Sequence, residues 1–330
     1  MEQFFSHILE SIQKTPAILL SPHSLLSIPC LLSTVLVAAG FYMWRRGGRP
    51  LRMRALWRGL FPRRIWASPS TRTDIYYALA NTFLLPAVVA GAILARDRVD
   101  VWATFQLEEV FGPMVQQGSA PPALVLTVMI VALYLAYELA YWLDHYLCHK
   151  IPFLWQFHRV HHSATVLTPL TNWRMHPVDT IVFFNIVALF MGFAHAGVNY
   201  AFGVPRADGL LAGGSVVVLV AFYLFAHLQH SHVWMAAHGK LGRVVASPAH
   251  HQVHHSTKPE HFDRNFGHTL SLFDWAFGTL YVPSKRCEVR SVGLADGAEL
   301  QGFFASLWRP FQRAFGGFGH VFHARRALNG

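Results

Sequence analysis

Long apolar stretches are the feature that most limits how this chain can fold. A helix needs about 20 consecutive apolar residues to cross the hydrocarbon core of a bilayer. The chain of 330 residues is 53% hydrophobic and 13% charged, against roughly 25% charged in soluble domains. We therefore expect an all-α integral membrane protein with about five membrane-embedded helices. The five stretches lie at about 24–44, 74–95, 122–143, 178–200 and 209–231.

Arginines gather directly after the first apolar stretch. Between residues 45 and 64 there are eight arginines and no acidic residue. Basic clusters beside a membrane helix mark cytoplasmic loops and bind anionic headgroups. Counting crossings from there puts the N-terminus outside, and puts residues 144–177 and all residues after 231 on the cytoplasmic side. Because no soluble reading domain is visible, the net charge of +10 points to a membrane surface and not to nucleic acid.

The cysteines and the N-terminal segment add little. Cys30, Cys148 and Cys287 are far apart and odd in number, so they predict neither a disulfide framework nor a thiol metal site. The first residues, MEQFFSHILESIQK, lack a basic leader and a small-residue cleavage pattern, and we expect no cleaved signal peptide.

Histidines are concentrated in one part of the chain. Of 21 histidines, 17 lie between His145 and His268. Many stand in three short motifs, DHYLCHK, FHRVHHS and SPAHHQVHHS. Residues three or four positions apart share a helix face, so each motif is expected to project two or three imidazoles in one direction. The clustered histidines are His145 and His149, then His158, His161 and His162, and then His250, His251, His254 and His255.

Metal binding is the economical explanation of these clusters. Isolated histidines such as His195, His232 and His238 are expected to be hydrogen-bond partners between helices. Imidazole suits zinc, copper, iron and nickel, and eight or nine histidines exceed what one ion takes, so two ions are expected. The zinc-hydrolase motif H-E-x-x-H is absent. An all-nitrogen pair beside a bilayer suits iron that activates dioxygen, although the spacing alone does not separate iron from zinc.

The ordered motifs resemble the fatty acid hydroxylase superfamily, also called the sterol desaturase family. The resemblance covers about residues 130–280. It implies a non-haem di-iron enzyme of lipid biosynthesis that uses dioxygen to hydroxylate or desaturate lipid chains or sterols, with a cytoplasmic histidine-rich helical cap. The motifs that carry it are DHYLCH, FHRVHHS, NWRMHP, HSHV, HHQVHHS and DRNFGHTLSLFDWAFGT.

We accordingly expect three parts in the chain. Residues 1–121 would be N-terminal membrane helices with an arginine-rich loop, residues 122–284 the catalytic domain, and residues 285–330 a basic peripheral tail. A bacterial inner membrane is the expected location.

The resemblance also implies which histidines bind metal. Histidine follows HS in HSHV, where the family usually has asparagine. His227, His250 and His176 are weaker candidates for further ligands. A ligating histidine usually donates its other N–H to a carboxylate or carbonyl, and Asp144, Asp179, Asp263, Asp274 and Glu138 are candidates for that role. The family's ligands carry over to His145, His149, His158, His161, His162, His230, His251, His254 and His255.

Several alternatives stay open at this point. The chain shows no dinucleotide fingerprint, no C-x-x-C and no haem-attachment motif, so electrons would come from an external carrier protein. Hydroxylation and desaturation are not separated, and the lipid substrate is not identified. Two other classes compete: a zinc-binding or metal-transport membrane protein, and a membrane cytochrome with His195 and either His227 or His230 as haem ligands.

Overall fold

The computed structural model describes residues 19–20, 24–47, 52–115, 121–204, 222–296 and 302–327. Within these ranges the protein is helical and contains no β-strand. Only two isolated bridges occur there, Val245 with Leu270 and Ser256 with Val292.

Three described helices are long and apolar enough to cross a membrane: α3 (Ile28–Arg45), α9 (Pro122–Lys150) and α11 (Pro177–Phe202). Each begins at a turn that suits a helix start. Proline stands at the beginning of all three, where its missing N–H has no helical partner to lose. The Ser27 hydroxyl also accepts the amide of Cys30 and caps α3. These helices confirm the expectation of an all-helical protein with apolar spans.

The expected continuous helix over 74–95 is not formed. The chain folds there into α6 (Pro69–Phe83), α7 (Leu85–Val89) and a 3-10 turn, η1 (Ala90–Ala92). Pro86 explains the break, because a proline inside a helix lacks an amide donor and its ring clashes with the carbonyl four residues earlier.

The fifth expected span falls mainly outside the described residues. Its described end is a π-helical turn, η3 (Phe222–Ala226), followed by the short α13 (His227–Gln229).

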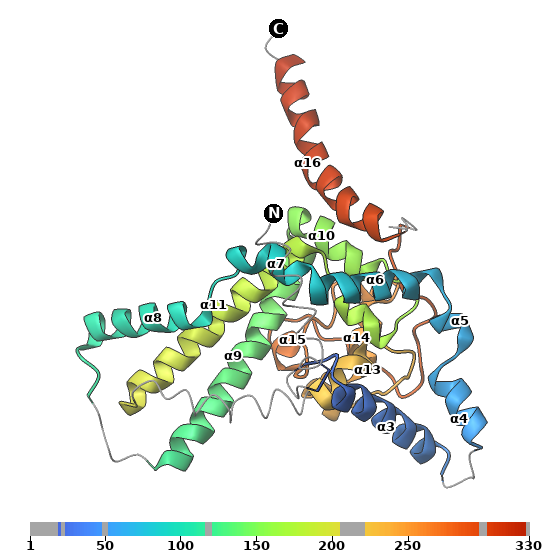
Figure 1. Ribbon diagram of the computed structural model, residues 1–330, viewed down its shortest axis with the longest axis horizontal. Coiled ribbons are helices and arrows are strands. Elements are labelled where there is room, and N and C mark those ends of the chain that lie inside the picture. Colours follow the sequence, from blue (N-terminus) through green and yellow to red (C-terminus); the bar gives the residue numbers. More distant parts are fainter. Residues whose placement is uncertain are drawn as a thin grey trace.

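Helices α9 and α11 pack side by side, and α8 (Arg96–Phe111) runs along α11 (Figure 1). The approach of α8 to α11 depends on Gly192, where an added methyl group would come within 2.6 Å of Val99 Cβ. A buried pair also joins these two helices, with His195 Nδ1 3.1 Å from a carboxylate oxygen of Asp100. His195 therefore has the interhelical role that an isolated histidine was expected to have.

The histidine-bearing end of the molecule is built from the C-terminal end of α9, from α10 (Pro152–His162) and from α14 (Pro248–His254). Helix α16 (Phe303–Ala327) covers part of α10, where Phe157 and Phe311 meet edge to face with ring centroids 5.2 Å apart. Beyond that contact α16 extends away from the rest of the molecule (Figure 1).

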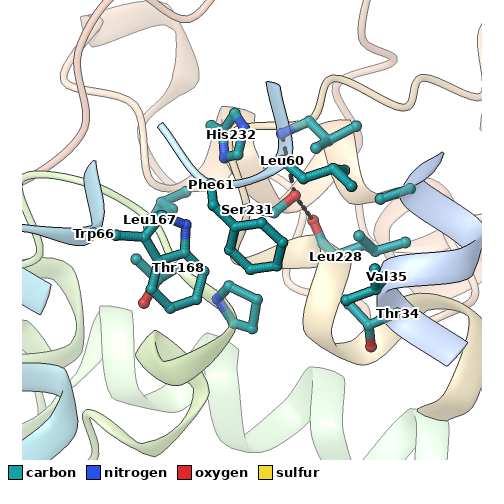
Figure 2. Close-up of a pocket in the computed structure, with 13 residues that line it drawn as sticks. Thr34, Val35, Leu60, Phe61, Trp66, Leu167, Thr168, Leu228, Ser231 and His232 are labelled. Carbon is teal, nitrogen blue, oxygen red and sulfur yellow. Dashed lines mark hydrogen bonds between the residues drawn. The ribbon is translucent and has the colours of Figure 1, made fainter. Parts of the chain in front are cut away.

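The arginine-rich segment lies against the same end. It forms α4 (Met53–Leu60) and α5 (Arg63–Trp66). Leu60 packs with Leu228 and Val233 around a cavity of about 50 Å³ (Figure 2). His232 Nε2 donates to the Gly59 carbonyl at 2.7 Å. His232 is thus a structural hydrogen-bond partner, and the end of α4 lies beside the loop that follows α13.

The remaining described elements are short. They connect the helices that hold the histidines. They are η2 (Pro169–Trp173), η4 (Leu241–Arg243), η5 (Pro259–His261) and α15 (Leu272–Ala276).

Candidate metal centre

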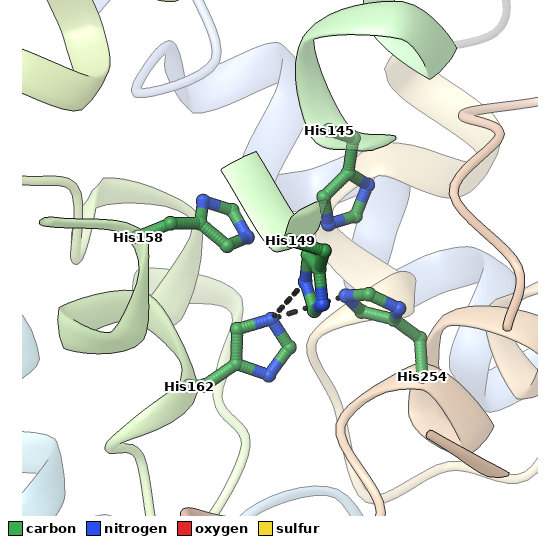
Figure 3. A group of neighbouring side chains, drawn as sticks. All are labelled: His145, His149, His158, His162 and His254. Carbon is green, nitrogen blue, oxygen red and sulfur yellow. Dashed lines mark hydrogen bonds between the residues drawn. The ribbon is translucent and has the colours of Figure 1, made fainter. Parts of the chain in front are cut away.

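Five imidazoles from three helices converge on one point (Figure 3). Each imidazole contributes one ring nitrogen, and these five nitrogens all lie within 4.8 Å of one another. In two of these contacts His162 Nε2 lies 3.1 Å from His149 Nε2 and 3.1 Å from His254 Nε2. We call this set the first group, and its members are His145, His149, His158, His162 and His254.

Four further imidazoles form a second group, again with one nitrogen each within 4.8 Å of the others. His230 Nε2 lies 3.0 Å from His161 Nε2 and 2.7 Å from His251 Nε2. His255 Nε2 lies 3.0 Å from His251 Nε2. All four residues, His161, His230, His251 and His255, are buried.

Helix geometry explains how the sequence clusters divide between the groups. Positions four apart lie one above the other on a helix. His158 and His162 of α10 therefore join the first group, while His161 points to the second. At the end of α14 His251 and His255 join the second group, and the intervening His254 joins the first.

The ring nitrogens are arranged as ligands and not as a hydrogen-bond network. A neutral imidazole has one donor and one acceptor nitrogen, so several Nε2 atoms in mutual contact cannot all be satisfied by one another. His145 Nε2 and His158 Nε2 are buried and have no hydrogen-bond partner within the described part of the chain. Buried polar atoms of this kind call for an explanation such as an ion, and a cation between them would accept every lone pair at once.

Burial also sets the protonation state that a metal requires. It lowers the pKa of His161, His251 and His255 well below the ordinary value of 6.5, and it lowers the pKa of His230 to about 3. These rings are neutral at physiological pH, and only a neutral imidazole can bind a metal ion.

Outer partners fix the rings of the first group. Asp179 holds His158 Nδ1 at 3.2 Å, and Asp263 holds His149 Nδ1 at 3.3 Å. Carboxylates and carbonyls in this position set the tautomer of a ligating imidazole and its orientation. Backbone carbonyls serve two of the remaining three rings: Phe266 O lies 3.0 Å from His145 Nδ1, and Arg264 O lies 2.8 Å from His254 Nδ1.

The other three acids named in advance do not touch a ring of either group. Asp274 accepts the amides of Phe266 and Gly267 and so holds the carbonyl that faces His145. Glu138 accepts the amide of Leu270 at 2.9 Å. Asp144 lines a cavity instead.

The three weaker ligand candidates lie outside both groups. Both nitrogens of each are already engaged in hydrogen bonds, which leaves no lone pair for an ion. His176 caps α11 at the Val178 amide and reaches the Leu307 carbonyl, His227 lies between Asn172 and the Leu25 carbonyl, and His250 lies between Ser247 and the Gly242 carbonyl.

Two cavities of different character open onto the histidines. The larger, about 560 Å³, is mainly apolar and touches His145 and His158 of the first group and His161 and His230 of the second. The smaller, about 250 Å³, touches His149, His162 and His254 and is bordered by the half-exposed Asp263. The candidate metal centre therefore lies between an apolar chamber and a more polar opening.

Sequence reasoning missed the residues that shape the larger cavity. Aromatic side chains such as Tyr137, Tyr141 and Phe183 line it, together with His268. Tyr137, Tyr141 and His145 stand four residues apart on α9, and that spacing is the one signal that could have identified a common face toward the histidines.

Comparison with known proteins agrees with this geometry. The family model described as fatty acid hydroxylase matches residues 130–279. The ornithine lipid hydroxylase OlsE of Rhizobium tropici is 28% identical over 51% of this chain and 46% of its own length. Alkylglycerol monooxygenase of Xenopus tropicalis is 23% identical over 61% and 38%, and human cholesterol 25-hydroxylase is 25% identical over 61% and 68%.

The matched region spans less than half the length of the first two of these relatives. No solved structure matches the chain. The matched residues include the histidines of both groups, so the part of the chain that holds the candidate metal centre, residues 130–279, is the part that matches the fatty acid hydroxylase family.

Proposed function

We propose that the protein is a membrane-bound oxidoreductase that uses dioxygen and two iron ions to hydroxylate, or to desaturate, a lipid or sterol-like substrate. One observation carries this proposal: nine imidazoles gather in two groups, and four of them, from both groups, line an apolar cavity between α9 and α11. The relatives named as lipid and sterol hydroxylases support it.

The nine grouped histidines would hold the two ions, one in each group. Iron bound there would supply dioxygen activation and the removal of hydrogen from an unactivated C–H bond. The chain itself contributes a fixed ligand geometry, since Asp179 and Asp263 hold the Nδ1–H groups of His158 and His149. We assign metal binding and catalysis to a catalytic domain over residues 122–284.

The larger cavity would bind the substrate. Its lining of tyrosine, phenylalanine, leucine and tryptophan side chains suits an apolar chain or ring system and excludes bulk water. A substrate seated there would present its C–H bond to the side where His145, His158, His161 and His230 meet the cavity.

We place the histidine groups on the cytoplasmic side of the membrane, with the N-terminus outside. For the histidine groups the support is a contact with the arginine-rich segment; for the N-terminus it is one membrane crossing by α3. Gly59, in the arginine-rich segment, accepts a hydrogen bond from His232, two residues after His230. Arginine-rich loops stay in the cytoplasm, so the histidines beside them are placed there too, within reach of an external electron-carrier protein.

The test begins with protein purified without oxygen. We expect about two iron ions per chain by elemental analysis and no haem band in the optical spectrum. Zinc in place of iron would support the metal-binding alternative, and a haem band would support a cytochrome. Absence of iron would overturn the proposal.

Lipid mass spectrometry of cells with and without the gene then tests the reaction. We expect a gain of one oxygen or a loss of two hydrogens in one lipid class. His161→Ala should abolish the change. His238→Ala, which alters an exposed histidine outside both groups, should leave it intact.

A further inference from the structure

We propose that the larger cavity binds its lipid through a positively charged amine that pairs with Asp144. This inference rests on the proposed function and names the substrate class: a long-chain amine, or a lipid whose headgroup carries an amine next to the apolar chain. This amine is inferred from an acid, Asp144, that has no hydrogen bond to a histidine of either group.

Asp144 lies on α9, is 5% exposed and lines the larger cavity. Its Oδ1 is buried and has no hydrogen-bond partner among the described residues. A buried carboxyl group without a partner is costly, and removing water from it is compensated only by a hydrogen bond or a counter-charge. A bound ligand that supplies both would remove this cost.

The rest of the cavity wall limits what that ligand can be. The second acid, Asp179, is already engaged with His158 Nδ1. Among the described residues that line the cavity there is no lysine or arginine. A fatty acid carboxylate or a phosphate at Asp144 would therefore lie near two acids with no lysine or arginine beside it, which disfavours an anion at that position.

A second polar atom faces the same cavity without a partner. Thr180, next to Asp179 on α11, is 7% exposed, and its Oγ1 has no hydrogen-bond partner among the described residues. An ammonium group has three N–H donors. It can pair with Asp144 and still donate to the Thr180 hydroxyl. An alcohol can donate to Asp144 and accept from Thr180, but it brings no positive charge to the carboxyl group.

The position of the acid predicts where the substrate is oxidised. Asp144 directly precedes His145, and both line the cavity together with His158. An amine held at Asp144 brings the carbons nearest the nitrogen to the histidines. We expect oxidation within a few bonds of the amine, and not at the far end of the chain.

Binding can be measured without turnover. Iron-loaded protein is kept anaerobic in detergent, and a brominated dodecyl alcohol quenches the fluorescence of Trp173, which lines the cavity. The Trp173→Phe variant gives the background. Dodecylamine, dodecanol and dodecanoate then compete for the site, and we expect dodecylamine to bind most tightly and dodecanoate least.

Asp144→Asn should weaken dodecylamine about tenfold or more, as expected for loss of a charged hydrogen bond, and should change dodecanol much less. Thr180→Val should weaken the amine by a smaller factor. Asp97→Asn is the charge-matched control, because Asp97 is 73% exposed and lies outside the cavity.

Three results would overturn the inference. One is a wild-type protein that binds dodecanol or dodecanoate at least as tightly as the amine. Another is an Asp144→Asn protein that keeps the preference for the amine. The third is an Asp144→Asn protein that loses iron while the ranking of the three probes stays the same, since Asp144 would then serve the metal. If Asp144→Asn fails to fold, the wild-type ranking and Thr180→Val decide.

These results are separable from the proposed function. A protein that holds iron and oxidises a lipid but does not prefer the amine keeps the function and loses this inference. A protein that prefers the amine but holds no iron keeps this inference and loses the proposed function.

Discussion

At the scale of single residues, the surroundings of both ring nitrogens decide what a histidine does. His250 and His251 are neighbours in α14 and both are buried. His250 bonds Ser247 with one nitrogen and the Gly242 carbonyl with the other, which makes it a structural clip. His251 has no hydrogen-bond partner at Nδ1 among the residues that the structure describes, and its Nε2 lies close to His230 and His255. The sequence motif does not distinguish His250 from His251, whereas the hydrogen bonds of the folded protein do.

Asp179 gives a first prediction at this scale. Asp179→Asn keeps the size of the side chain but removes the charge that holds His158 Nδ1. Outer carboxylates of this kind contribute about ten- to hundredfold in metal affinity. We expect the first group to lose metal at correspondingly lower chelator concentrations, measured by chelator competition and elemental analysis. Asp97→Asn should behave as wild type, and unchanged affinity in Asp179→Asn would contradict the assigned role.

Buried neutral histidines predict a pH dependence. Burial lowers the pKa of His250 to about 4 and that of His230 to about 3, from the ordinary 6.5. Between those values and 6.5 the unfolded chain binds protons that the folded chain refuses. The free energy of unfolding therefore falls as pH drops below about 6.5.

Thermal melts of the metal-free protein between about pH 7.5 and pH 5 measure this effect. We expect the melting temperature to fall across that range, because imidazoles titrate there. His250→Gln, which removes one titrating ring without touching either group, should show a shallower fall. A melting temperature that does not change with pH would contradict the prediction.

At the scale of elements, α10 joins the two groups, since it sends His158 and His162 to one and His161 to the other. Its position depends on the turn that follows it. That turn leads into η2, which is tied to α6 by a buried ion pair: Arg174 Nε lies 2.7 Å from Asp74 Oδ1. A loop and a helix far apart in sequence are thus held beside the histidines of α10.

This ion pair gives the prediction for the element scale. Asp74 is fully buried, and Thr171 also donates to it at 2.8 Å. Asp74→Asn leaves the guanidinium of Arg174 buried without its counter-charge, which costs about 3–5 kcal/mol of folding free energy. Thr168→Val removes only one neutral donor from the same carboxylate and should cost about 1 kcal/mol. Chemical unfolding in detergent measures both, and equal losses would contradict the importance of the ion pair.

At the scale of the whole molecule, the native cysteines report which side of the membrane the histidines face. Cys287 is exposed, whereas Cys30 and Cys148 are buried. A membrane-impermeant maleimide should label Cys287 in inverted membrane vesicles and not in intact cells, if the histidine side is cytoplasmic. Cys287→Ser should abolish the labelling. Labelling in intact cells would reverse the orientation.

The sequence by itself predicted the class of protein and the set of histidines that the fold brings together. Apolar runs over 24–44, 122–143 and 178–200 predict helices that the structure contains, because length and hydropathy are local properties. The resemblance named nine histidines, and the structure brings all nine into the two groups.

Only the tertiary structure decided how those nine divide. Each short motif was expected to project its imidazoles in one direction. In the structure His158 and His254 belong to the first group, whereas His161 and His251 belong to the second. The division depends on which helix ends meet in the folded protein, and the spacing of residues within one motif does not predict that. The same holds for Asp144, predicted as an outer partner of a ligand and found on a cavity wall, because α9 and α11 had to pack before there was a cavity to face.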